Sequence, residues 1–462
     1  MEFKSKLLVV ALAAAMPWVS AQAQSQADLQ KEIAALRAQL QALQQKVESL
    51  NAKTEAPAAS AAVAQQVNRL EQRLDLADDE AEKTGFKGMK INGTIEAGAG
   101  YDSQIGSNNF GASSGSTLDD KTYSGYGMVQ ITKETQGEGV DWTLRILPGA
   151  NQENLVHEAS ISIPVADGHR VVGGVIPDYQ GYEYVFPNAN PTLGNQLISH
   201  NALYDLAGAT QYQGLGMAHT LDGGKYAVKW MIGNVDPSID TDNDTSSPNT
   251  YSNGTKDRSV ALAYRGDWFI NEFAYIGLSG LHGSVNRNFR IMALDGGYTH
   301  GDWQFNGQIT AGWMRGAASN TDASGAQLDA EWTGLSALVG YKATPRLQLI
   351  ARADYLANSK NGGGTYVITT PTQNTLTRTG DDAATGLGPV RASDGTIENA
   401  GEVDNGANLT RLTLGTNYQI NSNAQWKVEY RIDQSSGHNF VDTNGVATRQ
   451  RSRIGTALVL SF

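Results

Sequence analysis

Cysteine is absent from all 462 residues, which excludes disulfide bonds and thiolate metal sites. Positive charge is in the minority: 35 Lys and Arg residues stand against 47 Asp and Glu residues, a net charge of -12. Binding to nucleic acid or to an anionic membrane surface is therefore not expected. Long apolar runs are scarce as well, although soluble proteins of this length usually build their cores from them. The apolar residues, 40% of the chain, must follow another pattern.

One helix-like apolar run stands at the N-terminus. Leu7–Met16 follows Lys4 and Lys6, and Ala21-Gln22-Ala23 then fits a small-x-small cleavage site. This order predicts a secretory signal peptide over 1–23. A membrane anchor is the alternative, but the run is too short to span the roughly 30 Å hydrocarbon core of a bilayer.

A heptad pattern follows, and we predict a periplasmic coiled coil over 24–84 with a break at 54–62, where Pro57 interrupts the helix. Because an isolated amphipathic helix is marginal in water, the seam predicts self-association, although one helix lying on another surface would show the same pattern. The a and d residues alone favour a dimer, the barrel predicted below favours a trimer, and we prefer the trimer without excluding the dimer. The seam consists of Leu29, Ile33, Leu36, Leu40, Leu43, Val47 and Leu50.

From Met89 onward the apolar period changes to two, which is the period of a β-strand. A soluble antiparallel sheet can also alternate, but no helical pattern is present that could cover its apolar face. Backbone groups in hydrocarbon must all be paired, so such strands must close on themselves. We therefore predict an all-β transmembrane barrel over 85–462. Its strands, about sixteen in number and antiparallel, are expected at 89–101, 122–134, 140–147, 157–165, 169–177, 209–221, 225–234, 257–266, 271–283, 289–299, 302–314, 330–342, 346–357, 407–420, 424–434 and 448–462.

The connections between these strands alternate in length. Short periplasmic turns and long outer loops are typical of outer-membrane barrels. With an even strand count, both ends of the barrel chain lie on the periplasmic side, where the coiled coil enters. The long polar connections are 102–121, 178–208, 235–256 and 358–406.

The last strand carries Ile454, Leu458, Leu460 and Phe462 on one face. An alternating final strand with a terminal Phe resembles the signal that the outer-membrane barrel-assembly machinery reads, so we expect this machinery as a partner. Outer-membrane lipid and lipopolysaccharide are the other expected partners, and the acidic loop at Asp240–Asp244 could hold divalent cations that bridge lipopolysaccharide.

The layout as a whole resembles that of proteobacterial porins with an N-terminal coiled coil. It is similar to an uncharacterised group of outer-membrane proteins filed as a domain of unknown function. Gly181-Tyr182-Glu183, with Pro187 and Asn188, resembles a short Gly-Tyr-Glu motif of barrel porins. The resemblance implies passive diffusion of small hydrophilic solutes or ions, and no particular solute can be carried over.

A sixteen-stranded barrel is wide enough to hold water. Because inward and outward residues alternate along each strand, the sequence predicts which residues line the pore. The last four strands place seven basic residues inward against three acids, so we expect a net basic wall and a modest anion preference at low salt. In the alternative, each charge only solvates the pore and pairs along the wall. The resemblance implies that 178–208 folds inward, with Asp178 and Glu183 as constriction acids. The inward residues are Arg352, Arg411, Lys427, Arg431, Arg449, Arg451 and Arg453, with Asp354, Glu429 and Asp433.

Patterns typical of enzymes are weak here. Gly111–Gly115 matches a nucleophile elbow but lies in a Ser/Gly-rich loop, and the histidines form no His-Glu-x-x-His pair. Asp240, Asp242 and Asp244 begin like a calcium loop, whose sixth and twelfth positions are not matched. We expect no enzyme, cofactor or metal. The alternative function is a structural or surface protein with a plugged barrel and a periplasmic coiled-coil spacer.

Overall fold

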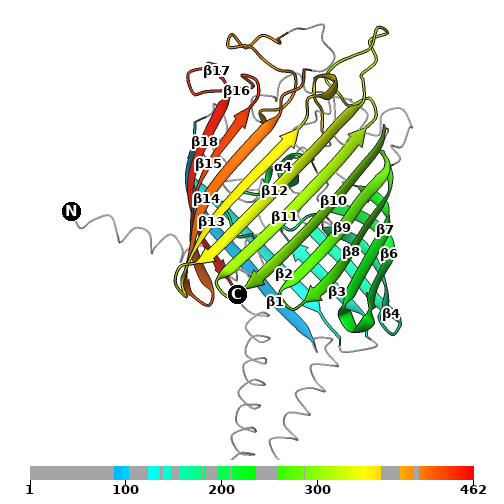
Figure 1. The fold of residues 1–462 in the computed structure, drawn as a ribbon. Helices are drawn as coiled ribbons and strands as arrows, with labels where there is room; N and C mark the ends of the chain where they lie inside the picture. Colours follow the sequence, from blue (N-terminus) through cyan, green and yellow to red (C-terminus); the bar gives the residue numbers. More distant parts are fainter. Residues whose placement is uncertain are drawn as a thin grey trace, which may run out of the picture. The chain divides into compact units, whose positions relative to one another are not determined.

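The computed structural model (Figure 1) describes residues 88–103, 123–135, 139–146, 156–177, 180–183, 195–207, 211–235, 259–285, 287–365, 385–398 and 405–462. The predicted signal peptide, the coiled coil with its heptad seam and the constriction acid Asp178 lie outside these ranges. Those three assignments therefore stay predictions. Among the described residues, no helix is both long and apolar enough to cross a membrane.

Sixteen strands form one closed antiparallel barrel, which confirms the predicted fold class. Neighbours in the barrel are neighbours in the chain, except that β18 (Gln450–Ser461) follows β15 and also pairs with β1 (Met89–Asp102). The short strands β16 (Phe440–Val441) and β17 (Ala447–Thr448) form a separate hairpin. The other strands are β2 (Tyr123–Lys133), β3 (Asp141–Ile146), β4 (Val156–Ala166), β5 (His169–Pro177), β6 (Gln211–Leu221), β7 (Tyr226–Val235), β8 (Ser259–Asn271), β9 (Ala274–Val285), β10 (Arg287–His300), β11 (Trp303–Met314), β12 (Ala330–Lys342), β13 (Leu347–Ala357), β14 (Leu409–Asn421) and β15 (Ala424–Ser435).

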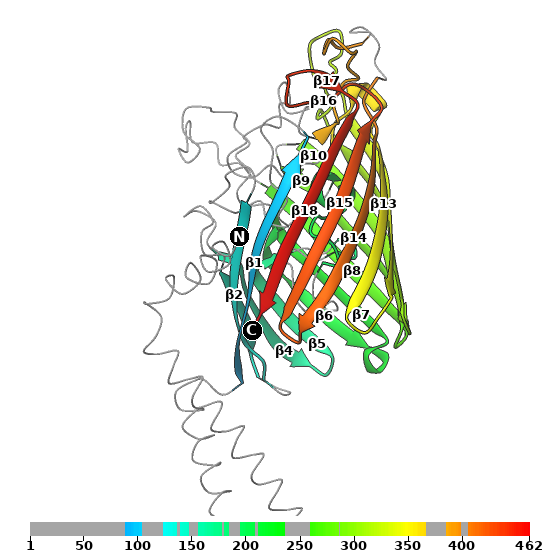
Figure 2. The same cartoon turned by 90° about the vertical axis from the view of Figure 1, so that its left-hand side faces the viewer.

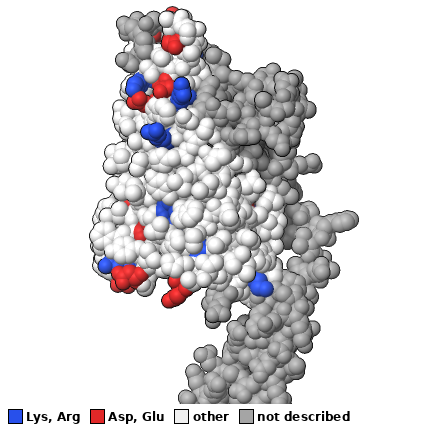
Figure 3. Space-filling model, turned by 90° about the vertical axis from the view of Figure 1, so that its right-hand side faces the viewer, with Lys and Arg blue, Asp and Glu red and all other residues white. Residues whose placement is uncertain are grey.

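The two-residue period gives each strand one inner and one outer face. On β12, Trp332 and Ser336 are buried inside the barrel, whereas Leu335 is 49% exposed on the outside. Large exposed apolar side chains recur on the outer faces of the other strands, as a lipid-facing surface requires. Figure 3 shows a largely uncharged band between charged residues near the two ends of one face. Trp303 at the start of β11 and Tyr341 near the end of β12 are both exposed, with ring centroids 4.7 Å apart.

The connections differ between the two ends of the barrel. Short turns, such as those between β4 and β5 and between β14 and β15, lie at one end, which we call the short-turn end. The strand ends that the longer connections join lie at the other end, drawn at the top of Figure 1 and called the long-loop end. The short helix α4 (Ala202–Ala207) belongs to the connection between β5 and β6 and lies within the barrel, against β11, β12 and β13.

The seam between β1 and β18 closes the barrel at the last residue of the chain (Figure 2). The Gly93 N–H donates to the Phe462 carbonyl over 2.9 Å, and the Phe462 N–H donates to the Gly93 carbonyl over 3.0 Å. A Cβ atom at Gly93 would lie 2.1 Å from the Phe462 ring. The glycine therefore lets the terminal aromatic ring lie across β1, and a larger side chain there would push the exposed Phe462 ring aside.

The main apolar core lies inside the barrel, toward the long-loop end. Ala202 and Leu203 of α4 belong to it, together with buried residues on the inner faces of β6 to β14. Ala318, Leu387 and Phe440 join it from the long connections. This part of the inner face is thus packed, and the polar inner face lies below it, toward the short-turn end.

Candidate functional site

Two stretches of the connection between β5 and β6 lie against the inner wall; together, 180–183 and 195–207 are called the inward segment. The Arg265 Nη1 of β8 donates to the Gly181 carbonyl over 3.2 Å. The Tyr182 hydroxyl lies 2.7 Å from the Ser336 Oγ of β12. The first stretch is therefore fixed to strands on one side of the barrel before the chain reaches Glu183.

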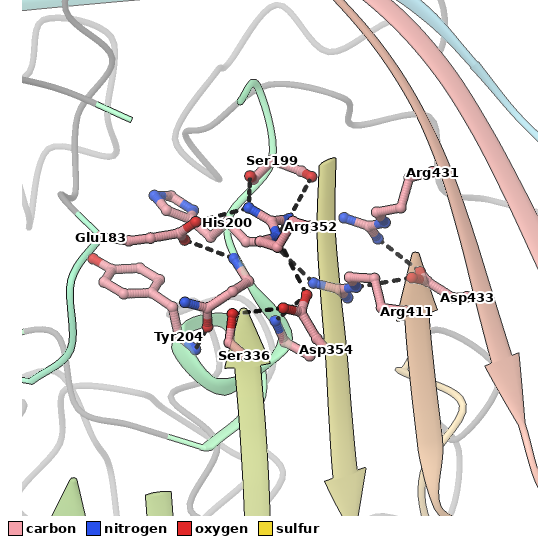
Figure 4. A network of polar contacts seen from close by, with 12 residues as sticks. Glu183, Ser199, His200, Tyr204, Ser336, Arg352, Asp354, Arg411, Arg431 and Asp433 are labelled. Carbon is pink, nitrogen blue, oxygen red and sulfur yellow. Dashed lines mark hydrogen bonds and ion pairs between the residues drawn. The ribbon is translucent and has the colours of Figure 1, made fainter. Parts of the chain in front are cut away.

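Arg352 of β13 is the central anchor of the inward segment (Figure 4). Its Nη1 donates to the Glu183 Oε1 over 2.7 Å and to the Ser199 carbonyl over 2.8 Å, and its Nη2 donates to the His200 carbonyl over 2.6 Å. Its Nε lies 3.3 Å from the Asp354 Oδ2. The planar guanidinium has five N–H donors, so one side chain can hold both stretches of the segment at once.

Asp354 and Asn201 fix the start of α4. Asp354 accepts hydrogen bonds from the Ser336 hydroxyl over 2.7 Å and from the Ala202 N–H over 3.1 Å. The Asn201 side-chain oxygen accepts from the Tyr204 N–H over 2.8 Å, as an N-cap residue does. The Asn201 N–H donates to the Glu183 Oε2 over 2.6 Å, so the helix start is also tied to the first stretch.

Glu429 and Lys427 of β15 hold the second stretch at its beginning. Glu429 accepts from the backbone N–H groups of Ile198 and Ser199, over 2.7 and 3.0 Å, and from the Ser199 hydroxyl. Lys427 donates to the Asn195 carbonyl. These buried charges each find partners in the segment, which is what keeps their burial from destabilising the protein.

Two glycines on the inner wall receive apolar side chains of the inward segment. A Cβ at Gly334 of β12 would lie 2.0 Å from the Leu203 Cδ2, and one at Gly415 of β14 would lie 2.4 Å from the Leu197 Cδ2. Leu203 and Leu197 are 1% and 2% exposed. The wall is therefore shaped to fit the segment as well as charged to bind it.

The remaining inward basic residues pair with two aspartates. Arg411 and Arg431 each lie 2.8 Å from Asp433. Arg451 and Arg453 each lie 2.5 Å from Asp102 of β1. Asp102 reaches this group because β1 and β18 are neighbours. A count of charges over the last four strands alone does not include Asp102.

The charges of this wall balance. Six buried or nearly buried cations on β13, β14, β15 and β18 face six acids, so their sum is 6 − 6 = 0. Glu96 of β1 belongs to the set because it is buried and acts electrostatically on Lys427. The cations are Arg352, Arg411, Lys427, Arg431, Arg451 and Arg453, and the acids are Glu96, Asp102, Glu183, Asp354, Glu429 and Asp433.

The position of the expected pore-lining residues differs from the expectation in two respects. All of them except Arg449 lie on the inner faces of their strands, but the inward segment covers part of the wall on which they lie. Arg449 lies in the turn between β17 and β18 and is exposed, outside the strand that was expected to carry it. The covered residues are Arg352, Arg411, Lys427 and Glu429, which contact the segment directly, with Arg431 and Arg451 buried beside them.

The Glu183 carboxyl is buried between Arg352 and the Asn201 N–H. Burial raises its pKa above the ordinary value, while Arg352, His200 and the Asn201 N–H act in the opposite direction. No group of three or more His, Asp or Glu side chains suited to a metal ion occurs within the described ranges.

The wall formed by β3, β4 and β5 is different. Arg145 and Glu158 pair over 3.3 Å, and Arg170 and Asp141 pair over 2.6 Å. The side chains of the second pair are 25% and 29% exposed, in contrast to 0% for Arg352. Sequence reasoning did not single out these four residues, although strand alternation marks them as the polar face.

A closed sixteen-stranded barrel with an apolar outside, a polar inside and a connection folded inward defines a porin-type barrel of the outer membrane. The chain belongs to the family described as "Putative beta-barrel porin-2, OmpL-like", which matches residues 88–462. This membership confirms the resemblance to outer-membrane porins that the sequence layout indicates.

Solved structures of outer-membrane proteins are similar to this chain at low sequence identity. The anion-selective porin from Comamonas acidovorans is 8% identical, with a TM-score of 0.49 over 81% of this chain and 99% of that one. A loop L8 deletion mutant of OmpT from Vibrio cholerae is 10% identical, with a TM-score of 0.48 and the same coverage. The outer membrane channel DcaP of Acinetobacter baumannii is 11% identical, with a TM-score of 0.48 over 81% and 97%. No curated protein matches this chain.

Proposed function

We propose that this protein is a porin that lets small hydrophilic solutes or ions diffuse passively through a water-filled barrel. The observation that carries the proposal is the asymmetry of the inner face: the inward segment covers one wall, while charged pairs on the wall formed by β3, β4 and β5 keep partial exposure. If the inner surface served only as a packed core, these charges would be expected to be replaced by apolar residues, because burying a charge costs free energy. The proposal is a channel and not an enzyme.

The inward segment is the proposed constriction, with Glu183 as a constriction residue. Its network to Arg352, Arg411, Lys427 and Glu429 would hold it at a fixed distance from the wall formed by β3, β4 and β5. A rigid constriction gives a porin a defined size limit, because the narrowest cross-section decides which solutes pass.

The envelope arrangement is proposed from the sequence. The short-turn end faces the periplasm, the signal peptide 1–23 directs export, and 24–84 self-associates as a coiled coil, with a trimer favoured over a dimer. The barrel contacts lipid and lipopolysaccharide, and the barrel-assembly machinery reads the final strand ending at Phe462. The supporting patterns are the heptads and the alternation of connection lengths.

A structural or surface protein with a plugged barrel is the second candidate. One observation favours it: the apolar cluster around Leu203 fills the inner face near the long-loop end, with Phe289, Trp332 and Phe440 each at most 2% exposed. If this cluster extended across the whole lumen, no solute would pass.

Swelling of proteoliposomes separates the two candidates. Liposomes that contain the full chain should swell in isotonic solutions of a pentose and swell progressively less as the sugar is enlarged to a tetrasaccharide. Protein-free liposomes are the control, and circular dichroism of the same preparation confirms that the barrel is folded. If folded, inserted protein gives no swelling with the smallest sugar, the porin proposal is wrong and the plugged barrel is favoured.

A further inference from the structure

The two walls of the barrel differ in their access to water. On β13 and β15 every second residue is buried from one end to the other, and on β14 every second residue is buried from Leu409 to Asn417. Arg352 and Arg411 are among them. On β3 and β4 the corresponding inward residues are half-buried, including Arg145 and Glu158. A conducting path needs accessible surface, and the described residues offer it on the second wall.

The covered charges are poorly placed to select ions. They are already satisfied by short contacts with one another and with backbone groups of the inward segment. Because the inward segment covers Arg352 and Arg411, an ion in the passage would meet the segment before it met either of them.

The charges of the accessible wall are held rigidly. Arg145 donates from Nε and Nη2 to the Gln130 Oε1 over 2.9 and 2.6 Å, and its Nη1 lies 3.3 Å from Glu158. Arg170 donates to the Ser162 Oγ over 2.7 Å and pairs with Asp141. These contacts hold each guanidinium against the wall while part of it stays open to water.

The two pairs lie at different heights. Asp141 and Arg145 are four residues apart on one strand, which corresponds to about 13 Å along it. The Arg170 pair is nearer the short-turn end and the Arg145 pair nearer the long-loop end, since β3 begins at Asp141. An ion that follows this wall therefore meets two separate charged positions in succession.

We propose that the pairs Arg145–Glu158 and Arg170–Asp141 line the conducting path and determine its charge selectivity, in place of the arginines beneath the inward segment. This inference rests on the proposed porin function and names the selective residues within it. Because each pair combines one cation and one acid, the selectivity of the parent protein is weak, and removal of either partner leaves the other to act alone.

Reversal potentials across a planar bilayer under a KCl gradient test the proposal. Arg145→Gln should shift the permeability ratio toward cations and Glu158→Gln toward anions, each by about threefold to fivefold, the size expected from one unit charge near an ion in water. The double variant should return close to the parent value, and Arg145→Lys, which keeps the charge, should match the parent. All shifts should shrink as the salt concentration rises.

Arg290→Gln is the matched control, because Arg290 lies on the outer face of β10 beside Trp313 and its removal changes the charge equally. Its reversal potential should equal that of the parent. A conducting channel whose reversal potential is unmoved by Arg145→Gln and by Glu158→Gln would overturn this inference and leave the porin function standing. A folded parent protein without any conductance would refute the porin function, and the inference with it.

Discussion

Arg352→Met should release the inward segment from the wall. The substitution keeps an unbranched, flexible side chain but removes the donors to Glu183, Ser199 and His200. Glu183 would stay buried and keep the hydrogen bond from the Asn201 N–H to its Oε2, while its Oε1 would lose the bond from Arg352. Removal of one partner from a buried ion pair costs about 3–5 kcal/mol because it leaves an uncompensated charge.

That cost acts on the equilibrium between the docked and the released segment. Each 1.4 kcal/mol is a factor of ten, so the ratio of docked to released segment should fall on the order of 100- to 4,000-fold. Single-channel recordings of the variant should therefore show a larger and noisier open level than the parent. Chymotrypsin should also cleave the native protein near Tyr204, which α4 protects in the parent.

Two further variants make this test specific. Arg346→Met removes an exposed arginine from the turn before β13 and should leave conductance and cleavage unchanged. The double variant Glu183→Gln with Arg352→Met removes both charges and should be closer to the parent than Arg352→Met alone. Parent-like conductance in Arg352→Met, or a double variant as noisy as the single one, would refute the role assigned to this ion pair.

Four other predictions follow from the same structure. Gly334→Val should displace Leu203 and loosen the segment at a cost of about 1–3 kcal/mol, which raises single-channel conductance without loss of the barrel's circular dichroism signal. Burial raises the pKa of Glu183, so the docked segment binds a proton more tightly than the released one. Docking is therefore strongest at low pH and weakens as the pH rises through the raised pKa, so conductance should fall as the pH is lowered, a response that Glu183→Gln should lose. Deletion of 29–50 should weaken the oligomer on native gels but leave an inserted barrel. An epitope tag at the hairpin tip Gly445 should be labelled on intact cells; labelling only after permeabilisation would reverse the proposed orientation.

Strand alternation predicted most of the barrel because lipid outside and polar groups inside impose the two-residue period on each strand. The predicted strands at 169–177 and 330–342 coincide with β5 and β12. β8 was placed at 257–266, whereas it extends from Ser259 to Asn271. Trp268, Phe269 and Ile270 are all exposed there, and a register shift follows Phe269, so the alternation is lost before the strand ends.

The charge balance of the wall could not be predicted from the last four strands alone. Asp102 and Glu96 lie at the other end of the barrel chain, and only closure brings β1 beside β18. The pairing of all backbone groups in hydrocarbon implied that closure. The inward positions of Asp102 and Glu96 in the alternation of the first strand were therefore the signal that could have added them. The close approach of Leu203 to Gly334 and of Leu197 to Gly415 had no such signal in the sequence. A glycine in a strand indicates lost packing as readily as a close approach of another side chain.

Conductance of the purified full chain in a planar lipid bilayer tests the central claim, a water-filled path through the barrel, most directly. The proposal predicts stepwise current increases whose size scales with the conductivity of the bathing salt solution. Bilayers that contain folded, inserted protein and stay electrically silent would contradict it.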